Sequence, residues 1–88
     1  MVPVFTASVE IHLKPGALDP QGQAVGDGLR SLGYAGVREV RVGKHVRVRL
    51  QAADAAAAAQ VVERMCQELL ANPVMETYRF TVTRDDER

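Results

Sequence analysis

The first regular pattern in the chain is an alternation of apolar and polar side chains within residues 4–13. The apolar members of this pattern are Phe5, Ala7, Val9, Ile11 and Leu13. The polar members between them are Thr6, Ser8, Glu10 and His12. A period of two with β-branched residues is typical of a strand that is buried on one face only. Other elements of the fold therefore have to cover that apolar face.

Two segments are predicted to form helices that could provide this cover. The first begins at Asp19–Pro20, because aspartate accepts hydrogen bonds from free amides at a helix start and proline fits the first turn. It continues as far as Gly33. The second begins at Asp54 and extends to about Ala71, before Asn72–Pro73. The predicted buried stripes are Val25, Leu29 and Leu32 in the first helix, and Val61, Met65 and Leu69, flanked by Val62 and Cys66, in the second.

Residues 37–42 and 46–50 are predicted to form a hairpin. A loop of residues 43–45 keeps the valines of both strands on one face, which a two-residue turn would not do. Residues 75–83 form the last predicted strand. The order predicts an α+β fold, a ferredoxin-like βαββαβ sandwich whose antiparallel sheet carries two helices on one face. Residues 1–84 are expected to form a single domain, and residues 85–88 a frayed tail.

Composition disfavours several classes of function. Eleven basic and eleven acidic side chains cancel among the 88 residues, which argues against nonspecific nucleic-acid binding because proteins with that function usually carry an excess of basic residues. No run approaches the ~20 apolar residues of a membrane span, and the N-terminus lacks the layout of a signal peptide. The single cysteine, Cys66, indicates a reducing compartment. We therefore expect a cytoplasmic protein with no nucleic-acid or membrane partner.

The residues that could carry chemistry form no catalytic or metal-binding pattern in the sequence. His12 and His45 lie far apart, and Cys66 has no base beside it. Gly43–Lys44 is either an anion-binding turn or an ordinary hairpin tip. A cationic strip or a mixed, solvated sheet face could be formed by Arg41, Arg47, Arg49 and Arg79. We expect no catalytic, cofactor-binding or metal-binding residue in this chain.

Three motifs resemble those of one small protein family. They are LDPQG at residues 18–22, VRVGK at residues 40–44 and ELLANPVMETY at residues 68–78. Together they are similar to the PurS family, the small subunit of phosphoribosylformylglycinamidine (FGAM) synthase. The similarity extends from about Val4 to Phe80 and agrees with the predicted order of elements.

The resemblance implies a role in the fourth step of purine synthesis. That reaction converts formylglycinamide ribonucleotide, glutamine, ATP and water to FGAM, glutamate, ADP and phosphate. A PurQ glutaminase subunit releases ammonia, and a PurL synthetase subunit uses ATP and Mg²⁺. The small subunit is implied to hold no cofactor, to form a homodimer or homotetramer, and to bridge PurQ and PurL while supporting ammonia transfer.

Two turns are the candidate contacts to these partners, and their residues are Gly43, Lys44, Asn72, Pro73, Met75 and Glu76. The reason is that both segments are turns, and packing alone does not require Lys44 or Glu76 there. An alternative interpretation is a stand-alone ACT-like regulatory domain, which has the same order of elements and binds a small molecule between subunits. A small nucleic-acid-binding module is disfavoured by the neutral charge and by the inward-facing aromatic residues.

Overall fold

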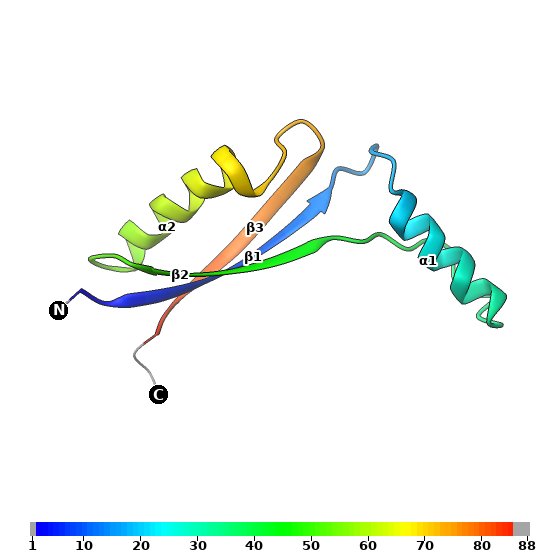
Figure 1. Ribbon diagram of the computed structural model, residues 1–88, viewed down its shortest axis with the longest axis horizontal. Helices are drawn as coiled ribbons and strands as arrows, with labels where there is room; N and C mark the ends of the chain where they lie inside the picture. The colour runs from blue at the N-terminus through cyan, green and yellow to red at the C-terminus, as the bar shows by residue number, and fades with distance from the viewer. Residues whose placement is uncertain (1, 86–88) are drawn as a thin grey trace.

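The computed structural model describes residues 2–85, whose elements follow in the order β1, α1, β2, α2, η1 and β3 (Figure 1). The strands are β1 (Val4–Leu13), β2 (Lys44–Gln51) and β3 (Glu76–Arg84). The helices are α1 (Pro20–Ser31), α2 (Ala55–Met65) and the π-helical turn η1 (Cys66–Leu70). The α+β class predicted from the sequence is confirmed.

The three strands form one antiparallel sheet in the order β2-β1-β3. The alternation predicted for β1 is confirmed, since Phe5, Ala7, Val9 and Ile11 are all buried. The register aligns them with apolar rows on both neighbours, namely Val46, Val48 and Leu50 of β2 and Tyr78, Phe80 and Val82 of β3. One face of the sheet is therefore apolar, and the other carries polar and charged side chains.

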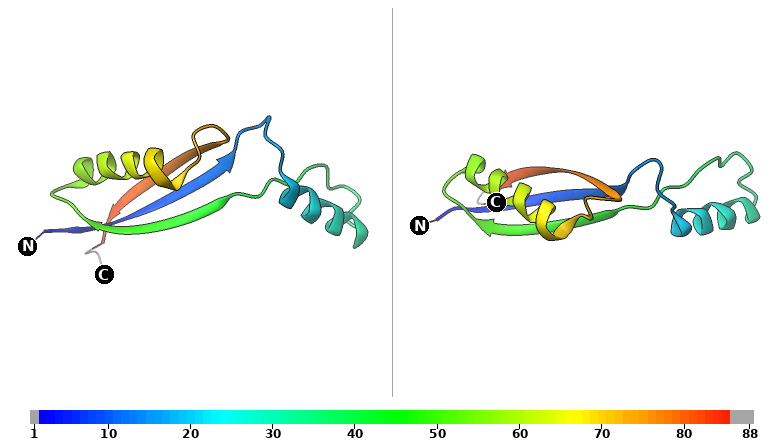
Figure 2. Two further views of the ribbon diagram at one scale, coloured as in Figure 1. Left: turned by 45° about the horizontal axis from the view of Figure 1, so that its top comes forward. Right: turned by 90° about the horizontal axis from the view of Figure 1, so that it is seen from above.

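Helix α2 packs on the apolar face over β1 and β3 (Figure 2). Asp54 caps its start as predicted, because the carboxylate accepts a hydrogen bond of 2.8 Å from the Ala57 amide. The fully buried residues of α2 are Ala58 and Val62, and Cys66, the first residue of η1, is fully buried as well. The stripe predicted to be buried, formed by Val61, Met65 and Leu69, therefore does not lie at the centre of the contact between this helical segment and the sheet.

The prediction that Leu69 is buried is wrong, since its side chain is 84% exposed. The chain leaves α2 through η1, where the Ala71 amide bonds to the Cys66 carbonyl five residues earlier. A π turn holds one more residue than an α turn, and this extra residue rotates Leu69 away from the sheet.

The predicted hairpin between residues 37–42 and 46–50 is also wrong. Residues 37–43 lie outside the sheet and run without reversal into β2, which begins at Lys44 (Figure 1). Gly43 does not have a positive φ angle. A Cβ atom there would lie 2.6 Å from the Ile11 carbonyl oxygen and 2.7 Å from Nδ1 of His12. Glycine is required at this position by the close approach of β1, not by a turn.

Helix α1 lies beyond the end of the sheet and not over its face (Figures 1 and 2). We call residues 14–43, which contain α1 and the segment that returns from it, the arm. The molecule measures 54 × 32 × 14 Å and has a radius of gyration of 17.0 Å. A compact chain of this length has a radius of gyration of about 12 Å. The arm therefore does not cover the sheet of its own chain.

The end of β3 is anchored to the other two strands. Asp85 accepts hydrogen bonds from Oγ1 of Thr6 at 3.0 Å and from Nε of Arg49 at 2.9 Å, and its amide donates to the Val4 carbonyl. The frayed tail expected from the sequence starts at this residue. Residues 86–88 lie outside the described part of the chain.

Gly43→Ala is expected to lower the free energy of unfolding by about 1–3 kcal/mol, because the added methyl group would overlap the Ile11 carbonyl and the His12 ring. Urea denaturation followed by circular dichroism measures this change. Gly36→Ala is the matched control, since no atom lies within 4 Å of a Cβ at that position. Equal stability of the two variants would show that Gly43 is not closely packed.

Candidate functional site

The structure brings the two predicted contact turns together at one end of the sheet. Lys44 is the first residue of β2 and Glu76 is the first residue of β3, and both strands pair with the end of β1. Nζ of Lys44 lies 3.5 Å from Oε2 of Glu76. Gly43, Lys44 and Glu76 also line a hollow of about 340 Å³ between the sheet and the root of the arm, together with Leu18.

The turn of residues 72–76 is held by its own polar groups. Oδ1 of Asn72 accepts a hydrogen bond of 2.9 Å from the Val74 amide. The Asn72 carbonyl accepts from the amides of Met75 and Glu76, at 3.2 and 2.7 Å. Lys14 adds two bonds from outside the turn, since its amide donates to the Met75 carbonyl and its Nζ to the Pro73 carbonyl. The turn is therefore a fixed structure.

Glu76 has a role inside this turn that sequence reasoning missed. Its side chain is only 15% exposed. Oε1 accepts a hydrogen bond of 2.7 Å from the Asn72 amide, while Oε2 faces Lys44. Packing thus does require Glu76, contrary to the reason that singled it out in the sequence. The spacing of four residues between Asn72 and Glu76 was the available signal, because it lets a carboxylate reach back to close a turn.

Large apolar side chains are exposed both in this turn and in η1 just before it. Leu69, Val74 and Met75 are 84%, 78% and 42% exposed. Of these, only Met75 was a candidate from the sequence. Leu69 was assigned to the buried stripe of the helix, so its exposure could not be expected without knowledge of the π turn.

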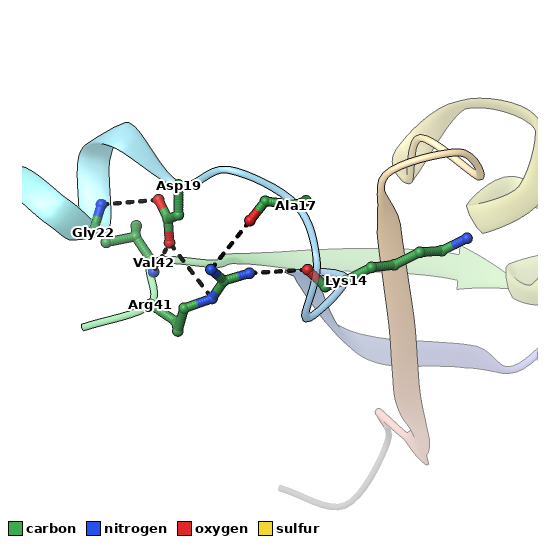
Figure 3. A network of polar contacts seen from close by, with 6 residues as sticks. All are labelled: Lys14, Ala17, Asp19, Gly22, Arg41 and Val42. Atoms are coloured by element: carbon green, nitrogen blue, oxygen red, sulfur yellow. Dashed lines mark hydrogen bonds and ion pairs between the residues drawn. The ribbon is translucent and has the colours of Figure 1, made fainter. Parts of the chain in front are cut away.

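A second polar network fixes the root of the arm around the carboxylate of Asp19 (Figure 3). Oδ1 accepts a hydrogen bond of 2.8 Å from the Gly22 amide at the start of α1, and Oδ2 accepts one of 2.9 Å from the Val42 amide. Nε of Arg41 lies 4.0 Å from Oδ2. One side chain thus ties the beginning of α1 to the segment that returns from it.

Arg41 extends this network to the chain that leaves β1. Its guanidinium donates to the Ala17 carbonyl at 3.2 Å and to the Lys14 carbonyl at 2.9 Å (Figure 3). The sequence placed Arg41 on the open face of the sheet, and the structure places it in the arm instead. Of the other three arginines considered there, Arg49 pairs with Asp85 and Arg79 pairs with Glu10.

Helix α1 and residues 37–43, the returning segment, approach each other closely near the start of α1. A Cβ atom at Gly22 would lie 2.2 Å from the Val40 carbonyl oxygen, and one at Gly26 would lie 3.5 Å from Cγ2 of Val40. Helix α1 therefore contacts the returning segment at Val40, and Gly22 permits this approach, whereas the distance at Gly26 is an ordinary van der Waals contact. Arg30 closes the far end by donating to the Val37 carbonyl.

The side chains that could take part in catalysis are either buried or not grouped into one site. Burial raises the pKa of the Cys66 thiol, which disfavours the thiolate that a nucleophile needs. A hydrogen bond with the Glu63 carboxylate raises the pKa of Tyr78. Among residues 2–85, no three His, Cys, Asp or Glu side chains gather to hold a metal ion. Within the same residues, no helix is long and apolar enough to cross a membrane.

Comparison with known proteins gives one consistent family. A family model described as PurS, phosphoribosylformylglycinamidine (FGAM) synthase, matches residues 6–84. The FGAM synthase subunit PurS of Synechocystis sp. is 48% identical over 79 residues, which cover 90% of this chain and 79% of that protein. The structure of PurS from Thermus thermophilus in its P21 form has 43% sequence identity to this chain and a TM-score of 0.82. The match covers 92% of this chain and 96% of that one.

A chain from the structure of PurLQS from Thermotoga maritima also superposes on this one, with a TM-score of 0.83 and 28% identity. The match covers 92% of this chain and 99% of that one. The fold expected from the resemblance to this family, ferredoxin-like and PurS-like, is confirmed.

Asp19→Asn is expected to loosen the root of the arm. The amide keeps one oxygen for Gly22 but presents an NH₂ group to the Val42 amide and to Arg41. Hydrogen exchange of the Val42 amide should become faster. Asp54→Asn is the matched control, because that carboxylate caps only Ala57 and asparagine caps a helix as well as aspartate. Unchanged exchange at Val42 in Asp19→Asn would contradict this role.

The same site predicts a direction for pH dependence. The hydrogen bonds from Gly22 and Val42 lower the pKa of Asp19 below its usual value. Its contribution to stability is therefore complete above the unfolded pKa of about 3.9 and is lost as the pH falls through the lower folded value. The protection factor of the Val42 amide, which is the exchange rate corrected for the intrinsic pH dependence of exchange, should fall on acidification in the wild type and change less in Asp19→Asn.

Proposed function

The chain belongs to the PurS family and is a subunit of the FGAM synthase complex, and on this premise we propose how it acts there. It forms a homodimer or homotetramer that holds a PurQ glutaminase and a PurL synthetase together. In this position it supports the passage of ammonia from one to the other. The Thermotoga maritima relative, which comes from a PurLQS structure, supports partnership with these two subunits.

The observation that carries this proposal is the position of the arm. A helix with an apolar stripe normally covers a sheet, and α1 lies beyond the sheet of its own chain (Figure 1). Val25 and Leu32 of that stripe are 43% and 77% exposed. On the sheet, α2 lies over β1 and β3, and the apolar side chains of β2 are only partly buried.

These two apolar surfaces are complementary. The Asp19 network and the close contact at Gly22 hold the arm in its extended position, so α1 is not free to fold back onto its own sheet. In the proposed homodimer, α1 of each copy covers the β2 half of the other copy's sheet. Such an exchange completes both sandwiches at once.

Catalysis is left to the other subunits in this proposal. ATP and Mg²⁺ act at the synthetase, and the glutaminase supplies the nucleophile that releases ammonia. No cofactor is assigned to this chain. The complex would work in the cytoplasm, in keeping with a reducing environment for the free Cys66 thiol.

The proposal predicts that glutamine-dependent FGAM synthesis by purified PurL and PurQ of the same organism falls to background when this chain is omitted. The physical reason is that ammonia released at a detached glutaminase is diluted into solvent, whereas a bridged pair delivers it at high local concentration. Formation of ADP, measured with and without the chain, tests this.

Free ammonia is the control substrate. With ammonium chloride in place of glutamine, the synthetase should work without PurQ and without this chain. If the chain were equally necessary with free ammonia, it would be acting on the synthetase itself. If it changed neither rate, the bridging role would be refuted.

A further inference from the structure

We propose that the returning segment, residues 37–43, pairs as a fourth strand with the free edge of β2 in a second copy of this chain. This pairing rests on the homodimer of the proposed function and specifies which backbone groups join the two chains. It is antiparallel and places residues 37–43 of each copy beside residues 45–51 of the other. The hairpin that the sequence predicts is then formed between two chains instead of within one.

One edge of β2 has no neighbouring strand among the residues that the structure describes. In the order β2-β1-β3, β2 lies at the side of the sheet and pairs with β1 alone. An edge of this kind presents a row of unpaired amides and carbonyls, which native proteins protect or cover. Helix α2 does not cover it, because α2 lies on the face of the sheet over β1 and β3 (Figure 2). The edge of β2 is therefore a backbone surface that fits a further strand.

The register shows which residues of β2 face this edge. The Ala52 amide donates to the Pro3 carbonyl at 3.1 Å, directly beyond the pair of Gln51 with Val4. Residues of an antiparallel strand direct their amides and carbonyls alternately to one side and to the other. The even-numbered residues of β2 therefore bond to β1, and the odd-numbered residues direct their backbone groups to the free edge. These odd-numbered residues are His45, Arg47, Arg49 and Gln51.

The same alternation continues into the returning segment. The Val42 amide donates to Oδ2 of Asp19, and the Val40 carbonyl oxygen lies against α1. Because both of these groups face the arm, residues 39, 41 and 43 direct their backbone groups to the opposite side. Within the described part of the chain, residues 38–43 form no backbone–backbone hydrogen bond. The free edge of β2 thus continues without interruption along the returning segment.

Apolar side chains select the register of the pairing. Val46 and Val48 pack against the core on the apolar face of the sheet. When Val42 lies opposite Val46, the apolar row continues through the next even-numbered pair. That pair is Val40 with Val48, and both valines of the returning segment are half-buried. A shift of two residues that brings Val42 opposite Lys44 would break this row.

Charged side chains support the same register on the other face of the sheet. Glu39 then lies opposite Arg49, and opposite charges that face each other across two strands stabilise the pair. Glu39 forms no ion pair with any residue between 2 and 85. The alternative shift by two residues would place Arg41 opposite Arg49 and would bring two like charges together.

Two contacts between like charges arise in this register, and both are relieved within each chain. Arg41 lies opposite Arg47, but its guanidinium donates to two carbonyls in the arm. Lys44 meets Lys44 of the second copy on the two-fold axis, and Glu76 lies 3.5 Å from the Lys44 of its own chain. Since each chain offers the same edge to the other, the contact closes with one second copy.

Disulfide formation between two chains tests the register. In a Cys66→Ala background, one chain carries Val40→Cys and a differently labelled chain carries Val48→Cys. Residues of an antiparallel pair that exchange no hydrogen bonds have Cα atoms about 4.5 Å apart, which a disulfide can bridge. With oxidised glutathione, a covalent dimer of the two chains should be the main product. Val42→Cys in place of Val40→Cys is the matched control and should give little product, because its Cα atom lies about 7–8 Å away.

Hydrogen exchange of the unsubstituted protein tests the same pairing without a change in sequence. In the oligomer, the amides of Arg47 and Arg49 should be protected about tenfold or more above those of Phe80 and Val82. The latter two amides are the matched control. They point to the outer edge of β3, since the Asp85 amide donates to β1 and the even-numbered residues of β3 alternate with it.

The outcomes distinguish this pairing from the function on which it rests. A covalent dimer of the Val40→Cys and Val48→Cys chains, together with protected amides at Arg47 and Arg49, supports the pairing. Unprotected amides there overturn it, and so does a disulfide that forms only within a single chain carrying both cysteines.

Glutamine-dependent FGAM synthesis with PurL and PurQ is measured on the same preparations. If synthesis requires the chain and the pairing is absent, the strand pairing fails and the bridging function stands. If the pairing is present and synthesis does not require the chain, the bridging function fails and the strand pairing stands.

Discussion

The carboxylate of Asp19 is the interaction on which the rest of the structure depends. By accepting from the amides of Gly22 and Val42, it joins the first turn of α1 to the segment that leads into β2. Arg41 then ties both to the chain that leaves β1. These contacts fix the arm as an extension of the sheet (Figure 3). Without them α1 could fold over β2, and the chain would be a closed ferredoxin-like sandwich.

The consequence is a chain whose core is only half covered. Small domains bury a low fraction of their surface even when compact, so a sheet with a single helix over two of its three strands has little margin of stability. Side chains that α2 does not cover, on β2 and on α1, are the groups that a second copy can bury. In the proposed homodimer, oligomerisation and stability would be the same property.

The sequence predicts the local structure well and the placement of the arm poorly. The alternation in β1 and the caps at Asp19 and Asp54 depend on neighbours within a few residues, and all three are confirmed. The hairpin prediction is wrong because alternation shows that a strand has one apolar face but not which strand lies beside it. Gly43 was read as a turn residue, whereas the backbone of β1 approaches it from another part of the chain.

The candidate site shows the same division. Sequence reasoning found the turn at residues 72–76. The fold brings Lys44 to this turn, and the sequence did not predict that contact. Sequence reasoning misjudged Glu76, whose two oxygens are engaged within the chain, and it missed Leu69, whose exposure follows from one π turn. The periodic spacing of apolar residues in helices and strands gives no information on either a side chain that closes a turn or a π turn, and this is the source of both errors. The apolar stripe of α1 would likewise have the same sequence pattern if it covered the sheet of its own chain or the sheet of another copy. The pattern therefore cannot distinguish these two arrangements.

The central claim is that α1 of one copy covers β2 of another, and crosslinking between differently labelled chains tests it most directly. In a Cys66→Ala background, one chain carries Val25→Cys on α1 and the other carries Val48→Cys on β2. A short bis-maleimide reagent should join the two chains in a mixture, and sedimentation of the unlabelled protein should give at least twice the 9.6 kDa of the single chain. A third variant carries both cysteines on one chain. If a crosslink forms within that single chain but not between the two differently labelled chains, or if the mass is that of a monomer, the proposed exchange of α1 is contradicted.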